Sequence, residues 1–106
     1  MLTVLIRYIG INGNAKKFVE EMISTRLVEE IRNEEGNLRY EYFFPMDDKE
    51  SVLLVDSWIN QEALDRHHQL PFMNKIKELR EKYDLHMEVE KYQSFVDKND
   101  EQYIRR

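Results

Sequence analysis

Short-period hydrophobic patterns in this chain predict β-strands. Residues 2–9 are rich in Leu, Val, Ile and Tyr and end at a turn signal that contains two glycines, so we expect a first strand there. Apolar and polar side chains alternate over residues 37–44 and again over residues 84–95, which predicts a second and a last strand. The second strand gathers its larger apolar side chains on one face: Leu38, Tyr40, Tyr42 and Phe44.

The third strand, predicted over residues 51–58, has a different pattern. Its segment Val52-Leu53-Leu54-Val55 is apolar at every position, which is typical of a strand whose two faces are both covered. In a lone chain, the face that no helix covers would form an exposed apolar patch, and such patches mark protein contacts. The pattern therefore predicts a homodimer.

Apolar residues spaced three and four positions apart predict helices between the strands. Residues 14–31 keep this spacing throughout and predict one long helix with Asn14 as its N-cap. A shorter helix begins after Asn60 and ends near Gln69, before the break at Leu70-Pro71. A further helix begins at Pro71; its charged positions over residues 75–82 predict a solvated face, and its buried stripe is Phe72, Ile76, Leu79 and Tyr83.

The predicted order of elements is β-α-β-β-α-β. This is the split βαβ arrangement of ferredoxin-like folds, an α+β class with an antiparallel sheet and helices on one face. We assign residues 1–96 to one such domain and residues 97–106 to a polar C-terminal tail that we expect to fray. With 106 residues and 13.0 kDa, the chain has room for one domain only.

Composition excludes several function classes. Sixteen Lys and Arg against 21 Asp and Glu give a net charge of −5, so the chain has no basic surface for nucleic acid. The lack of cysteine excludes disulfides and thiolate nucleophiles and favours a reducing, cytoplasmic environment. No apolar run is long enough to cross a membrane, and the N-terminal residues lack the pattern of a leader peptide.

One spacing of residue types extends over most of the chain. An acidic residue and the glycine after it stand five and four residues before a tyrosine. A second acidic residue precedes a tryptophan by two, and a histidine follows that tryptophan by nine. The residues are Glu35, Gly36, Tyr40, Asp56, Trp58, His67 and the following Pro71. In this pattern the chain resembles the antibiotic biosynthesis monooxygenase (ABM) family.

The resemblance implies a dimeric α+β barrel and a monooxygenase that uses no flavin, haem or metal cofactor. Its substrate would be a quinol or another small aromatic molecule whose anion reduces oxygen directly. His67 would be the catalytic base, because an ordinary imidazole pKa of about 6.5 suits proton transfer near neutral pH. The remaining candidates would bind the substrate: Trp58, Tyr40, Tyr42, Asn37, Arg39 and Asp56.

Each candidate also has a purely structural interpretation. Trp58 and the two tyrosines can serve packing alone, because large aromatic side chains dominate buried area. His67 lies one helical turn after Ala63 and can be a hydrogen-bonded core residue, whereas His68 points about 100° away and is expected on the surface. Asp56 can orient His67 or Arg39, or it can be an ordinary charge at a strand end.

Other activities need signals that the sequence lacks. No His-x-x-x-His pair and no cysteine occur, so we expect no metal site. Residues 71–82 contain no histidine, and the resemblance to haem-degrading relatives is weakened accordingly. Two alternatives to a monooxygenase stay open: a non-catalytic ligand-binding or stress-associated protein, and an isomerase of a phosphorylated signalling sugar, whose basic groups would be Lys16, Lys17, Arg26 and Arg39.

Overall fold

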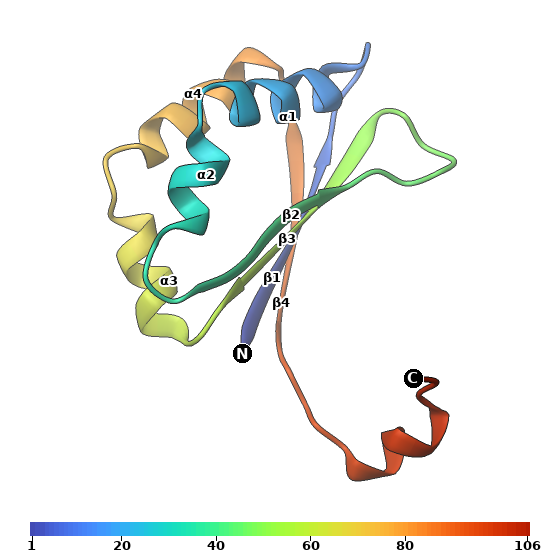
Figure 1. Cartoon of the computed structure of the whole chain (residues 1–106). Helices are drawn as coiled ribbons and strands as arrows, with labels where there is room; N and C mark the ends of the chain where they lie inside the picture. The colour runs from blue at the N-terminus through green and yellow to red at the C-terminus, as the bar shows by residue number, and fades with distance from the viewer.

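A computed structural model describes all residues of the chain, 1–106. Four strands and four α-helices follow one another in the order shown in Figure 1, and a short 3-10 helix lies near the C-terminus. The bounds are β1 Leu2–Ile9, α1 Asn14–Ser24, α2 Leu27–Arg32, β2 Asn37–Phe43, β3 Ser51–Trp58, α3 Gln61–His68, α4 Met73–Lys82, β4 His86–Gln93 and η1 Lys98–Tyr103.

The four strands form a single antiparallel sheet in the order β2-β3-β1-β4. All four α-helices lie on one side of this sheet, and no α-helix covers the opposite side (Figure 1). This is the ferredoxin-like α+β fold that the sequence predicts. The strand bounds agree with the prediction to within one or two residues, and β3 agrees at both ends.

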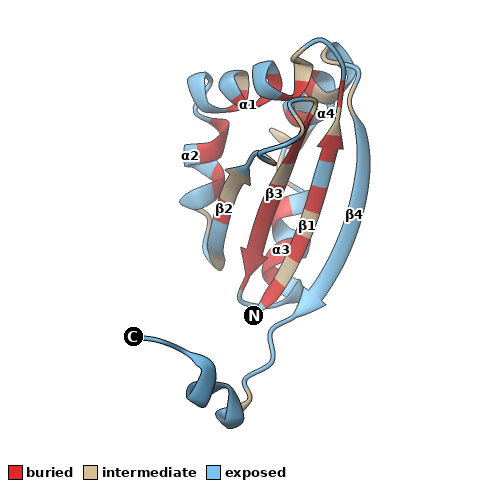
Figure 2. Ribbon diagram, turned by 90° about the vertical axis from the view of Figure 1, so that its right-hand side faces the viewer, coloured by how far each residue is buried: buried red, intermediate tan, exposed pale blue.

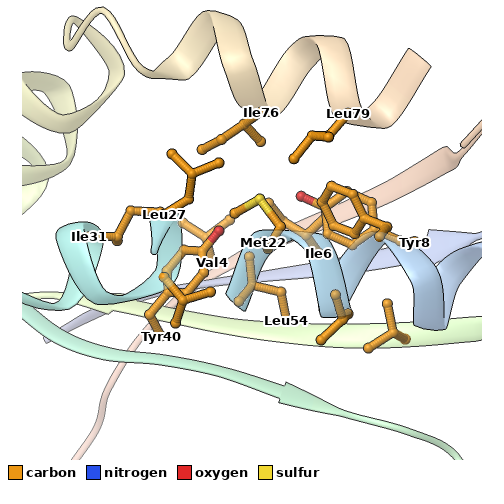
Figure 3. Packing of buried hydrophobic residues seen from close by; sticks show 14 of the residues in the cluster. Val4, Ile6, Tyr8, Met22, Leu27, Ile31, Tyr40, Leu54, Ile76 and Leu79 are labelled. Carbon is orange, nitrogen blue, oxygen red and sulfur yellow. The ribbon is translucent and has the colours of Figure 1, made fainter. Parts of the chain in front are cut away.

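The hydrophobic core lies between the sheet and the helices. Strand β1 contributes every second residue, from Leu2 to Tyr8, because successive side chains of a strand point to opposite faces. Figure 3 shows this layer together with Met22 of α1 and Ile76 of α4. Tyr8, Met22 and Ile76 are at most 1% exposed, so the core is closed at its centre.

The long helix predicted over residues 14–31 is wrong, because the chain forms two helices. The break falls at Arg26, whose φ of 65° is left-handed, and the Thr25 hydroxyl donates a 2.6 Å hydrogen bond to the Glu21 carbonyl. The new direction brings Leu27 and Ile31 into the core, with 3% and 0% exposure. An even apolar spacing does not reveal such a break, because both halves keep the same period.

The predicted N-cap is also wrong. Gly13, with a φ of 75°, is the N-cap residue of α1, and Asn14 is the first residue of the helix. The Asn14 side chain instead donates a 3.1 Å hydrogen bond to the Tyr83 carbonyl. This bond joins the start of α1 to the end of α4, so Asn14 contributes to tertiary packing and not to capping.

The helix-free face of the sheet is less apolar than the sequence suggests. Val55 of β3 is only 9% exposed there without a helix above it, because Leu5 and Glu41 flank it on the neighbouring strands. The same face carries several charges: Arg7, Arg39, Glu41, Glu88 and Glu90. A partner that covers this face must therefore meet a mixed surface.

Strand β4 and the tail are the least protected parts of the chain. Every residue of β4 is exposed (Figure 2), although Val89 pairs with Ile6 and therefore lies on the same face as the core. The tail extends away from the body and ends in η1 (Figure 1), with Phe95 and Val96 at 86% and 89% exposure. None of the helices has the length and apolar content needed to cross a membrane.

Candidate functional site

Three of the predicted site residues meet where β3 ends and α3 begins. Asp56 and Trp58 are two positions apart on β3, so both point toward the helices. The Trp58 indole donates a 2.7 Å hydrogen bond from Nε1 to Asp56 Oδ1, and its ring centroid lies 4.7 Å from that of His67. Asn60 caps α3 by accepting from the Ala63 amide, and this start turns His67 inward.

A residue that the sequence analysis missed completes this cluster. Glu34 lies in the loop between α2 and β2, and its Oε2 is 2.7 Å from His67 Nδ1. Both side chains are well shielded, at 14% and 4% exposure. The sequence motif pointed to Glu35, which is exposed. The only signal for Glu34 was its place beside Glu35, just before the left-handed Gly36.

Burial makes charge unfavourable throughout the cluster. It raises the pKa of Glu34 to about 7, against a smaller effect of nearby His68, and lowers the pKa of His67 to about 4, helped by the positive charge of Arg80. Burial also raises the pKa of Asp56 to about 7, although the hydrogen bond from Trp58 opposes the shift. The imidazole is therefore neutral at pH 7, and the carboxyl groups are the groups that titrate there.

The geometry matches neither of the two expected roles of Asp56. Its carboxyl group makes its hydrogen bond with Trp58, and no hydrogen bond joins it to His67 or Arg39. Asp56 is 4% exposed, so it is not an ordinary surface charge at the end of a strand. Its position fixes the plane of the Trp58 indole.

Arg80 forms a second set of buried polar contacts, next to the predicted tyrosines Tyr40 and Tyr42. Tyr40 and Tyr42 of β2 pack edge to face with 5.7 Å between ring centroids, and burial raises the pKa of both hydroxyls. From α4, Arg80 Nη2 donates a 3.1 Å hydrogen bond to the Tyr8 hydroxyl. The Tyr42 hydroxyl and Arg80 Nε are buried without any hydrogen-bond partner.

The unpaired atoms are unusual because buried polar groups nearly always have partners. Arg80 also has no carboxylate within salt-bridge distance, so its charge is free to act on its surroundings, including His67 and Tyr8. The sequence analysis placed Arg80 on a solvated face. Its spacing of four residues from the buried Ile76 would have indicated the inward face.

The structure does not bring Asn37 and Arg39 to this interior. A β-bulge separates them, and Arg39 lies on the helix-free face, where it forms an ion pair with Glu41. The Asn37 side chain donates to the Ser57 carbonyl at 3.4 Å. Both residues line a surface hollow of about 430 Å³ that Tyr40 also borders. The predicted set therefore divides into an interior group and an outer group.

Comparison with known families decides the identity of the fold. The antibiotic biosynthesis monooxygenase family matches residues 1–79 of the chain. The match extends from β1 into α4 and leaves out the last residues of α4, strand β4 and the tail. The chain belongs to this family. The motif residues Asp56, Trp58 and His67 converge at the end of β3, and Tyr40 pairs with Asp56 between β2 and β3.

Solved structures similar to this ABM-family chain share its fold at low sequence identity. A candidate antibiotic biosynthesis monooxygenase from Deinococcus radiodurans has a TM-score of 0.79 and 15% identity, with 92% of this chain and 95% of that chain covered. SnoaB from Streptomyces nogalater, a cofactor-independent oxygenase, has a TM-score of 0.71 and 12% identity, with 92% and 95% covered. A comparison with curated protein sequences gives no match.

The interior of this ABM-family chain is tightly packed. Five surface hollows of about 390 to 540 Å³ lie on the chain, and neither Trp58 nor His67 borders any of them. An apolar hollow of about 390 Å³ between α1, α2 and β2 reaches Tyr42, whose buried hydroxyl is unpaired. No three His, Asp or Glu side chains lie close enough together to share a metal ion.

Proposed function

We propose that this protein is a monooxygenase that oxidises an electron-rich phenol or quinol with molecular oxygen and needs no cofactor of its own. Membership of the ABM family and the structural similarity to SnoaB, a cofactor-independent oxygenase, support the reaction class. The observation that carries the proposal is Arg80, a cation with a buried, unpaired Nε and no carboxylate partner. Such a group favours an anionic oxygen, which a deprotonated phenol supplies.

The side chains around Arg80 suit an aromatic anion. The Tyr42 hydroxyl is a second unpaired donor, and its raised pKa keeps it protonated. Trp58 offers a flat ring whose orientation Asp56 fixes. In the proposed complex, Arg80 and Tyr42 hold the phenolate oxygen, and Trp58 stacks on the substrate ring. A substrate would enter by displacing side chains, and the hollow that Tyr42 borders offers a point of entry.

The chemistry balances with oxygen as the only co-reactant. His67 accepts the proton of the phenol, and the anion then delivers electrons to oxygen from a ring carbon. A carbon–oxygen bond forms at a ring C–H carbon, which is the methylene carbon of the keto tautomer of the phenol. The oxygen–oxygen bond breaks, this carbon becomes a carbonyl, and its two hydrogens leave in the departing water, with His67 returning the proton that it took. One oxygen atom stays in the product and the other leaves as water, so a four-electron oxidation of carbon matches a four-electron reduction of oxygen. The protein holds, orients and deprotonates the substrate.

An oxygen electrode and a panel of hydroquinones, naphthols and anthrone-type phenols test this proposal. With a substrate, we expect one oxygen consumed for each product formed and one atom of ¹⁸O₂ in that product. Arg80→Met should lower kcat/KM by about 10²–10³-fold, as losing a charged donor to an oxyanion does. Lys77→Met, a charge removed from the exposed face of the same helix, is the control and should leave kcat/KM unchanged.

A second candidate is a non-catalytic protein that binds a small aromatic ligand. Binding without catalysis is favoured because none of the five hollows borders the candidate base His67, whereas one of them borders Tyr42. Saturable binding of a naphthol or quinol without oxygen consumption would replace the monooxygenase with this function. No observation favours the sugar-phosphate isomerase. Lys16, Lys17 and Arg39 border three different hollows, and Arg26 borders none of the five.

We further propose that the working unit is a homodimer in which two helix-free sheet faces meet as an α+β barrel. Half-buried Leu53, the exposed strand β4 and the extended tail support this arrangement. Aromatic side chains along β4 and the start of the tail, Tyr92 and Phe95, are 53% and 86% exposed and would lie at the contact. The lack of cysteine suits a cytoplasmic location for this dimer.

A further inference from the structure

The hydrogen bond between Glu34 and His67 can influence the protonation of the imidazole as well as the stability of the fold. It joins the α2–β2 loop to helix α3, and it is the only hydrogen bond that the His67 ring makes. Trp58 and Phe72 contact the same ring, at 4.7 and 5.9 Å between centroids. The imidazole is thus held by aromatic rings and by one carboxyl group, which leaves Nε2 as its available nitrogen.

The charged groups around Glu34 and His67 do not stabilise an ion pair between these two side chains. Arg80 of α4 disfavours a positive charge on His67, and Asp56 of β3 and Glu34 each disfavour a negative charge on the other. His68, next to His67 on α3, weakly favours ionised Glu34, and its own pKa is lowered by burial. The imidazole ring therefore stays neutral on both sides of the Glu34 titration.

A neutral imidazole beside a carboxyl group has two forms. When Glu34 is protonated, its hydroxyl donates to His67 Nδ1, and the ring proton is on Nε2. When Glu34 is ionised, it accepts from Nδ1–H, and Nε2 presents a lone pair. Loss of one proton from the pair thus changes Nε2 from a hydrogen-bond donor into an acceptor, without any charge on the imidazole.

We propose that Glu34 is a positioning residue that sets which nitrogen of His67 carries the proton, so that His67 becomes a proton acceptor when Glu34 ionises. The importance of this change for catalysis rests on the proposed function, but the change itself does not. It explains how a histidine in an apolar site serves as a base. The carboxylate then stabilises the imidazolium that forms when the ring takes the substrate proton.

Nitrogen NMR of ¹⁵N-histidine-labelled protein tests the proposal directly. Long-range proton–nitrogen correlation spectra show which ring nitrogen of His67 carries the proton. Between pH 5 and 9, we expect the proton to move from Nε2 to Nδ1 with a midpoint near 7, the value to which burial raises the pKa of Glu34. In Glu34→Gln this movement should disappear. Glu35→Gln removes the neighbouring, exposed carboxyl group and should behave as the wild type.

Two results would overturn the proposal. One is an imidazolium with protons on both nitrogens of wild-type His67 near pH 6–7, which would mean an ordinary ion pair. The other is an unchanged tautomer titration in Glu34→Gln. The first measurement needs only the wild-type protein, so it stands even if the variant fails to fold. If the tautomer changes as expected but no phenol is oxidised, the proposed function fails and the role of Glu34 as the positioning residue for His67 stands.

A kinetic readout applies if turnover is found. With an active substrate, kcat/KM should rise about tenfold per pH unit below 7 and then level off, because only ionised Glu34 leaves Nε2 free to accept. Glu34→Gln should remove this rise. Glu34→Asp should restore part of it, which a role in packing alone would not require.

Discussion

His67 is held by two kinds of contact that serve different ends. The rings of Trp58 and Phe72 pack against it and make the site apolar, and Glu34 gives it one hydrogen bond. Its side chain is 4% exposed, so a charge on it has little access to water. A residue in such a place contributes to stability, and under the proposed function it also transfers a proton, so a single substitution would affect both.

Replacing His67 separates these contributions when a control is included. His67→Ala should lower turnover of a substrate by about 10²–10⁴-fold, the usual contribution of a general base. It should also reduce the free energy of unfolding by about 1–3 kcal/mol, because it vacates a buried site and leaves Glu34 without its partner. Oxygen consumption and urea denaturation measure the two effects.

His68→Ala is the matched control for His67→Ala. His68 is exposed on the same helix, so both turnover and stability should stay close to the wild type. A greater loss in His68→Ala than in His67→Ala would contradict the assignment of the inward histidine.

Asp56 gives a pH-dependent prediction. Its pKa is raised by burial to about 7, so the folded protein binds a proton that the unfolded chain releases near pH 4. The stability that this protonation provides is complete at acid pH and is lost as the pH rises through 7. Asp56→Asn keeps the acceptor for Trp58 and cannot ionise, so it should match the wild type near pH 4 and be more stable at pH 8.

The size of this effect follows from the difference between the ordinary pKa of an aspartate, about 4, and the raised pKa of Asp56, about 7. At pH 8 the upper limit of the effect is on the order of 4 kcal/mol. We expect the free energy of unfolding of Asp56→Asn to exceed that of the wild type by roughly 1–4 kcal/mol at pH 8, as measured by urea denaturation at the two pH values. A variant that is less stable than the wild type at pH 8 would show that the ionised carboxylate is well solvated in the folded protein.

Residue spacing predicted part of this site. Asp56 and Trp58 share a strand face because they are two positions apart, and His67 turns inward because Ala63 and Leu64 precede it by one turn. The contacts of Glu34 and Arg80 could not be predicted from the sequence, because their partners His67 and Tyr8 lie 33 and 72 residues away. Contacts over such distances depend on the packing of elements, which local patterns do not encode.

At the scale of elements, the turn at Gly36 positions the site. Its φ of 89° is accessible to glycine, and its carbonyl accepts from the Ile59 amide at 2.9 Å, which joins the start of β2 to the end of β3. A Cβ at this position would lie 2.7 Å from the Ala63 Cβ on α3. The turn therefore brings the loop that carries Glu34 against the helix that carries His67.

Two glycine substitutions test the importance of this approach. Gly13→Ala introduces only a left-handed alanine, because no atom lies within 4 Å of the added Cβ, and should cost about 1–2 kcal/mol. Gly36→Ala adds a steric clash with Ala63 and should cost about 2–5 kcal/mol in all. Equal losses of stability in the two variants would mean that α3 moves away freely.

Element prediction succeeded for the strands and failed at the break between α1 and α2. Alternation with period two is specific for strands, and turn residues mark their ends. Nothing in the sequence around Arg26 marks a left-handed residue, since glycine or asparagine normally occupies such positions. The break is determined by the need to bring Leu27 and Ile31 over the sheet, which is a tertiary constraint.

At the scale of the whole molecule, the tail makes no hydrogen bond with the body. The hydrogen bonds made by residues 97–106 stay within the tail, and the last backbone bond to the body runs from the Ser94 amide to the Met1 carbonyl at 2.9 Å. Several of its apolar side chains face solvent: Phe95, Val96 and Tyr103. A segment of this kind suits contact with a second copy.

Deleting residues 95–106 tests that contact. Sedimentation of the wild type should give about twice the chain mass of 13.0 kDa at micromolar concentration, since stable dimer interfaces typically bury about 2,000 Å² or more. The shortened chain should keep its circular dichroism spectrum and dimerise more weakly. A monomeric wild type would remove the proposed barrel, and an unchanged dimer in the shortened chain would remove the tail from the interface.

Trp58 is the only tryptophan of the chain, and it lies against His67 with its indole nitrogen bound to Asp56. Its fluorescence therefore arises from a single place, which is the centre of the candidate site. An aromatic ligand that stacks on this indole will quench its emission, and a variant that loosens the cluster will shift the emission to longer wavelength. The protein thus carries an intrinsic optical probe with which a library of phenols can be screened before any reaction is known.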